Sequence, residues 1–175
     1  MVVFCDETGE LRMASDGSTN STANTQRAMV ERRVSELGPE HISTYKGMLK
    51  LALTLKRSTE TDTLLEAKTL LQKCIQGFEA KEGENSENAL SAMNSLAQVL
   101  SKLERDDEAE ALFRRTLAGR EEKLGKHHPE TMITVNNLAL LIDSKKGGGG
   151  VAGSEADQFF RRAMPFTPRD VIPHE

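Results

Sequence analysis

Two adjacent histidines, His127 and His128, are the side chains of this sequence that could most readily bind a metal ion. A protein zinc site needs three or four ligands held at fixed spacing. No further ligand accompanies this pair at helical spacing. We therefore expect no metal here, and we expect His128 to pack or cap beside Pro129, which suits the first turn of a helix.

The candidate nucleophiles are two cysteines, Cys5 and Cys74, which lie far apart in the sequence. Their spacing fits no metal motif and suits a reducing compartment, so we expect a cytoplasmic protein. The glycine run 147–150 lacks the Gly-Lys-Ser/Thr of a phosphate loop, and we interpret it as a linker. No Ser-His-Asp or paired-carboxylate constellation stands out, which predicts a protein that is not an enzyme and needs no cofactor.

Length, charge and composition limit the number of domains, the kinds of partner and the fold class. The 175 residues suffice for one domain. The net charge of −4 argues against nucleic acid as the main partner. No stretch approaches the roughly 20 apolar residues of a membrane span, so no membrane partner is expected. With no Trp, one Tyr and six Phe, a core must be built from Leu, Ala and Met, which favours helices.

The chain contains an internal repeat. The pair Leu96-Ala97 recurs downstream as Leu138-Ala139. A further such pair, Leu51-Ala52, lies a similar number of residues upstream of Leu96-Ala97. The positions that recur as small residues are Ala52, Ala97 and Ala139; Ala67, Ala109 and Ala156; and Cys74, Thr116 and Ala163. Small side chains at fixed places allow two antiparallel helices to pack closely, so each unit is predicted to be a helix pair. Cys74 is then expected to be an inert core thiol.

The units define the predicted domain organisation. We expect a right-handed, all-α solenoid over residues 25–164, with a partial unit at 25–37 and repeats at 38–82, 83–124 and 125–164. Residues 1–24 are rich in Ser, Thr, Asn and Asp and are predicted to form a disordered polar tail. Residues 165–175 form a Pro-rich tail that cannot continue a helix.

Two segments narrow the repeat class, LGKHHPETMITVNNLALL and AEALFRRTLAGREEKLG. They resemble the 42-residue tetratricopeptide (TPR) units of kinesin light chains and their relatives. The resemblance extends over about residues 26–164, and the third copy matches best. It departs at Ile42, which replaces the linker proline, and at Ser86-Glu87 of the second copy. The resemblance implies a protein-binding module, in which asparagines of the first helix bind the main chain of a peptide.

A concave groove is expected along the first helix of each unit. Amide side chains can donate to and accept from a peptide backbone, and lysines suit an acidic side chain or a carboxylate terminus. Apolar groove residues would be exposed without a ligand; the alternative is that some leucines belong to the core and the register is shifted by one. The candidate groove residues are Lys46, Leu49, Leu53, Lys56, Asn94, Gln98, Ile133, Asn136 and Leu140.

Two functional hypotheses follow. The first is a non-catalytic adaptor or scaffold that binds a peptide segment of another protein. The second is a structural or regulatory repeat segment of a larger protein, similar to a kinesin light chain or a repeat-bearing ATPase.

The last helix carries Phe159, Phe160 and Met164 without a polar capping helix after it. This predicts that the tail folds back through Phe166, that the chain self-associates, or that the array is longer.

Overall fold

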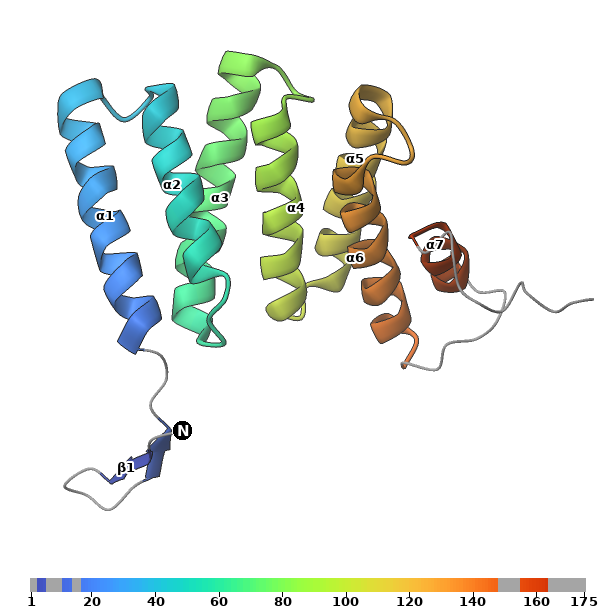
Figure 1. The fold of residues 1–175 in the computed structure, drawn as a ribbon, viewed down its shortest axis with the longest axis horizontal. Helices are drawn as coiled ribbons and strands as arrows, with labels where there is room; N and C mark the ends of the chain where they lie inside the picture. The colour runs from blue at the N-terminus through green and yellow to red at the C-terminus, as the bar shows by residue number, and fades with distance from the viewer. Residues whose placement is uncertain (1–2, 6–10, 14–16, 148–154, 164–175) are drawn as a thin grey trace, which may run out of the picture.

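The computed structural model describes residues 3–5, 11–13, 17–147 and 155–163. Within these ranges the chain forms a row of helices, and each helix lies antiparallel to the one before it (Figure 1). The fold is all-helical in class, as predicted. It is preceded by a small antiparallel hairpin of β1 (Val3–Cys5) and β2 (Leu11–Met13). The helices are α1 (Gly17–Leu37), α2 (Ile42–Leu55), α3 (Thr61–Glu82), α4 (Glu87–Lys102), α5 (Asp106–Leu124), α6 (Pro129–Lys145) and α7 (Glu155–Ala163).

The core follows the recurring small residues. Ala52, Ala97 and Ala139 on the first helices are fully buried, and so are Ala67 and Ala109 on the second helices. A methyl group at these places lets consecutive helices approach closely, and large side chains fill the space between the contact points. Phe78, Phe113, Leu71 and Met93 are the main bulky members of this core.

The joints between units share one backbone geometry. Gly38, Gly83 and Gly125 each follow a second helix and adopt φ values of +89°, +95° and +88°. Glycine reaches this left-handed region without the steric cost of a Cβ atom. In two of these joints a threonine hydroxyl then donates to the glycine carbonyl: Thr44 to Gly38 at 2.8 Å and Thr131 to Gly125 at 2.9 Å.

Histidines cap the helices that follow two of these joints. His41 Nδ1 accepts from the Ser43 amide at 3.2 Å, and His128 Nδ1 accepts from the Glu130 amide at 3.2 Å. The predicted capping role of His128 is therefore confirmed. Each imidazole satisfies one of the amide groups that a helix leaves unpaired at its first turn.

Replacing His128 by alanine is expected to lower the free energy of unfolding by about 1 kcal/mol, because the α6 cap is lost. His127→Ala is the matched control, since that side chain is exposed and one position removed from the cap. Urea denaturation followed by circular dichroism measures both. Equal losses in the two variants would contradict the assignment of the cap.

The N-terminal boundary of the solenoid was predicted too late in the chain. Residues 17–24 are helical, since α1 begins at Gly17, and Ala23 of this segment is buried at 3% exposure. The Ser/Thr/Asn-rich composition predicted disorder, but packing of α1 against α2 overrides a weak helix propensity. The hairpin also departs from the predicted tail. The glycines 148–150, Met164, Phe166 and the tail 165–175 lie outside the described residues.

Candidate functional site

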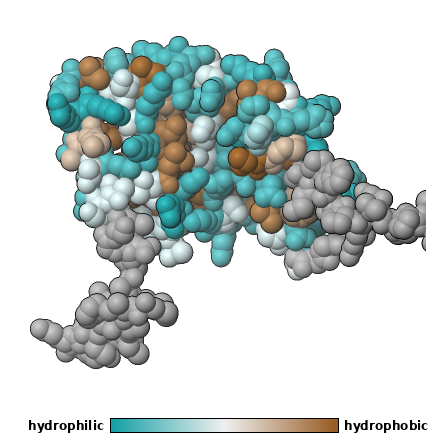
Figure 2. Space-filling view, in the orientation of Figure 1, coloured by the Kyte–Doolittle hydropathy of each residue, from teal (hydrophilic) through white to brown (hydrophobic). Residues whose placement is uncertain are grey.

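Helices α2, α4 and α6 form the inner side of the array. Among the described residues, Cα atoms of α2 and α4, and of α4 and α6, approach within 8 Å, whereas α1, α3, α5 and α7 make no such approach to one another. Unequal spacing of the two helix layers curves the row, with the closer layer on the concave side. In Figure 1, α2 and α6 lie in front of α3 and α5, and Figure 2 shows hydrophobic surface within hydrophilic borders on that face.

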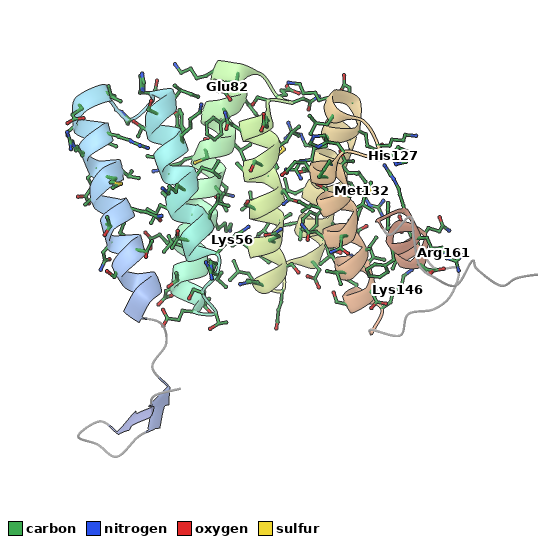
Figure 3. All side chains as sticks on the ribbon, in the orientation of Figure 1. Lys56, Glu82, His127, Met132, Lys146 and Arg161 are labelled. Atoms are coloured by element: carbon green, nitrogen blue, oxygen red, sulfur yellow. The ribbon has the colours of Figure 1, made fainter. Side chains whose placement is uncertain are left out.

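Two predicted groove residues meet between α2 and α4. Lys56 Nζ donates to Gln98 Oε1 at 2.7 Å, and Lys56 lies between these helices in Figure 3. Burial lowers the pKa of Lys56, and the neighbouring positive charge of Lys102 lowers it further. A half-buried ammonium whose neighbours are an amide and a second cation would be stabilised by a carboxylate.

An amide pair joins α4 and α6. Asn137 Nδ2 donates to Asn94 Oδ1 at 3.3 Å. Asn94 is 7% exposed, whereas Asn136, the residue predicted as its equivalent, is half-buried beside this pair. The pair leaves the remaining donors and acceptors of the amides available for other hydrogen bonds.

A cavity of about 200 Å³ opens beside this pair. Leu140 of α6 lies on its wall and is 53% exposed, and Ile133 of the same helix is 48% exposed. Exposed aliphatic side chains beside polar groups are typical of ligand-binding surfaces. The cavity is lined by Gln98, Ser101, Phe113, Asn137, Leu140, Leu141 and Ser144.

The expectation that all the apolar groove residues are exposed is wrong for the first unit. Leu49 is only 9% exposed and belongs to the core, and Leu53 is half-buried against that core. α2 packs between α1 and α3 and also approaches α4, so its Leu49 side becomes interior. The alternative interpretation, that some of these leucines are core residues, holds here. Lys46 of the same helix is exposed.

Asn137 and Lys102 are residues of this face that the sequence pattern did not single out. Lys102 Nζ donates to the carbonyl oxygens of Lys56 at 2.6 Å and Ser58 at 3.2 Å, which ties α4 to the end of α2. The sequence Asn136-Asn137 indicates an asparagine on this face. Neighbouring residues on a helix point in directions that differ by about 100°, so only one of the two can face α4 directly. Choosing between them required the position of α4.

The residues considered for chemistry lie away from this face or in the core. Cys74 is fully buried, its Sγ donates to the Tyr45 carbonyl oxygen at 3.4 Å, and burial raises the pKa of its thiol to about 12. A thiol with so high a pKa stays protonated at neutral pH and is a poor nucleophile, because the thiolate is the reactive form. Within the described ranges, three or more His, Cys, Asp or Glu side chains nowhere gather closely enough to hold a metal ion. None of the described helices combines the length and apolarity that crossing a membrane requires.

Comparisons with known proteins agree with this architecture. Residues 89–130 match the family model of the tetratricopeptide repeat. BtubC (BKLC) from P. vanneervenii has a similar fold, with a TM-score of 0.68 at 18% identity over 85% of this chain and 55% of that chain. Two structures of nearly identical TPR-like repeats of the kinesin-light-chain kind from Podosopora anserina give TM-scores of 0.70 and 0.64. Their identities are 18% and 19%, over 85% of this chain and 66% of those chains.

These matches identify one repeat segment and the fold of the array. Residues 89–130, which extend from α4 across α5 to the start of α6, are a tetratricopeptide repeat, and the whole array has the fold of a TPR solenoid. A search of curated protein sequences returned no match. The chain spans 55% to 66% of the length of the similar structures. TPR arrays are in general scaffolds for protein–protein interaction.

Proposed function

We propose that this protein is a non-catalytic interaction module that binds a peptide segment of another protein along α2, α4 and α6. The proposal rests on two side-chain hydrogen bonds that link the inner helices to one another. Lys56 reaches Gln98 from α2 to α4, and Asn137 reaches Asn94 from α6 to α4. These donors and acceptors support the proposal, because an extended main chain could exchange hydrogen bonds with them.

The chemistry of this face differs from one end to the other. α2 and the residue that caps its C-terminus contribute the cations Lys46 and Lys56, and α6 contributes the exposed side chains Ile133 and Leu140. We therefore propose a peptide with an acidic group near α2 and an apolar side chain near α6. The lowered pKa of Lys56 supports the acidic end, because a carboxylate would offset the cost of its burial.

A peptide-library screen against the full chain tests the proposal. The selected peptides should bind about tenfold more weakly to a Lys56→Ala, Asn136→Ala variant, because a charge-assisted and a neutral hydrogen bond are lost. Gln72→Ala is the control, since Gln72 is exposed on α3 and lies away from the inner helices. Circular dichroism checks that all the variants stay helical. Binding that ignores both groove substitutions would contradict the proposal.

A second candidate function is an intramolecular one within a longer repeat protein. It is favoured by the coverage of the similar structures, of which this chain spans 55% to 66%. The groove would then hold a segment of the same polypeptide. A screen that selects no peptide class would favour this candidate over the adaptor.

A further inference from the structure

The second helices of the units are joined by ion pairs at equivalent positions. Arg27 of α1 contacts Glu66 of α3 at 2.6 Å, and Arg114 of α5 contacts Glu155 of α7 at 2.7 Å. In each case an arginine on one second helix binds a glutamate at or near the first turn of the next second helix. Glu66 and Glu155 occupy the same place of their units, because each directly precedes one of the recurring alanines, Ala67 and Ala156.

A second kind of ion pair runs in the opposite sense. Arg115 of α5 contacts Glu79 of α3 at 2.7 Å, and Arg162 of α7 binds Glu121 of α5. Each of these arginines lies seven residues after the position that Glu155 occupies in its own unit. In α7 both members of this spacing, Glu155 and Arg162 seven residues later, bind the preceding second helix α5.

α7 carries an arginine at the position from which Arg114 of α5 binds the glutamate of the next unit. Arg161 of α7 occupies the position of Arg114 of α5. Arg114 is held by Glu110 of its own helix at 3.0 Å and also binds Glu155 of the next unit. Arg161 is likewise held by Asp157 of its own helix at 3.0 Å, but its side chain is 75% exposed, against 44% for Arg114. Figure 3 shows Arg161 on α7 at the end of the array.

The apolar side of α7 points to the same conclusion. Phe160 is half-buried, whereas the residues at its position in the earlier units, Leu71 and Phe113, are 0% and 2% exposed. α6, the first helix of the pair that follows α5, packs against α5 and lies beside Phe113. Phe160 and Arg161 of α7 therefore remain partly accessible to solvent.

We propose that the outer edge of α7, defined by Phe160 and Arg161, docks a further helix pair whose second helix carries a glutamate in its first turn. That glutamate would bind Arg161 as Glu155 binds Arg114. A second copy of this chain does not supply the matching charges. Its leading helix α1 has Ser21 at the glutamate position and Ala28 at the arginine position seven residues later.

The probe for this surface is a fluorescein-labelled peptide of residues 129–163, which is the α6–α7 sequence with Glu155 in the first turn of its second helix. Binding to the full chain is measured by fluorescence anisotropy. Arg161→Glu in the chain is expected to weaken binding about fivefold to tenfold, because an attractive pair becomes a repulsive one. A peptide with Glu155→Arg is expected to restore binding to that variant.

Two control variants test whether the peptide binds at this edge of α7. Arg32→Glu changes a similarly exposed arginine on α1, which pairs with Glu36 four residues later, and should leave binding unchanged. The groove variant Lys56→Ala, Asn136→Ala should also bind the helix-pair peptide normally. No binding of the peptide, or loss through Arg161→Glu without rescue by the reversed peptide, would overturn the proposal. Light scattering that shows self-association dependent on Arg161 would also overturn it.

Discussion

Replacement of Phe113 by alanine is expected to lower the free energy of unfolding by about 3–5 kcal/mol, which is the usual cost of emptying a buried aromatic site. Phe113 lies at the interface of the second and third units and is 2% exposed. It belongs to the same buried core as Ala109, which lies one turn earlier on the same helix. Since each unit of a solenoid is stabilised by its neighbours, the loss should affect the whole array. Urea denaturation followed by circular dichroism measures the change.

Phe160→Ala is the matched control, because Phe160 stands at the same position of the last unit and is only half-buried. Its loss should cost clearly less, since part of the ring already contacts solvent. If the two substitutions destabilised the chain equally, the burial gradient along the array would be wrong.

Replacement of Arg120 by alanine is expected to cost about 2–4 kcal/mol, because a buried charged donor leaves its partners behind. The side chain is 4% exposed and joins α5 to the start of α6. Its guanidinium donates to the Glu130 carbonyl oxygen at 2.8 Å and to Thr134 Oγ1 at 2.7 Å, and it pairs with the Glu130 carboxylate at 2.6 Å. Burial lowers the pKa of Arg120, while the carboxylates of Glu130 and Glu87 oppose that shift.

The control for this prediction is Arg115→Ala on the same helix. Arg115 pairs with Glu79 across α3 and α5, but its side chain is 47% exposed. Exposed ion pairs contribute little, and we expect a loss of no more than about 1 kcal/mol. A loss at Arg115 as large as that at Arg120 would show that burial does not decide the strength of these pairs.

The fold could be predicted from the sequence because the repeat constrains it at several levels together. Ala97 and Ala139 recur where two helices must touch, and Gly83 and Gly125 recur where the backbone needs a positive φ. The backbone conformation of the turn between α4 and α5 could not be predicted in this way. Glu104 adopts a φ of +58° there, a conformation that non-glycine residues seldom take. Nothing in the neighbouring residue types indicates it.

The candidate site could be predicted only in outline. Helical spacing selects a face but leaves an uncertainty of about one position, which is enough to interchange Asn136 and Asn137. The burial of Leu49 depends on how closely α2 approaches its neighbours, and that distance is a tertiary property. Arg120 follows Arg114 and Arg115 in a stretch of mixed charge, and its residue type alone does not indicate burial; it turns inward to α6 because Thr134 and the Glu130 carbonyl offer it partners.

Peptide binding along the face of α2, α4 and α6 is tested most directly by nuclear magnetic resonance. Amide chemical shifts of the full chain are followed while a peptide from the library screen is added in steps. We predict that the perturbed amides gather around Lys56, Gln98 and Asn136, while the outer helices α3 and α5 stay unchanged. Perturbations centred on α3 and α5, with the inner helices unaffected, would contradict the proposed groove.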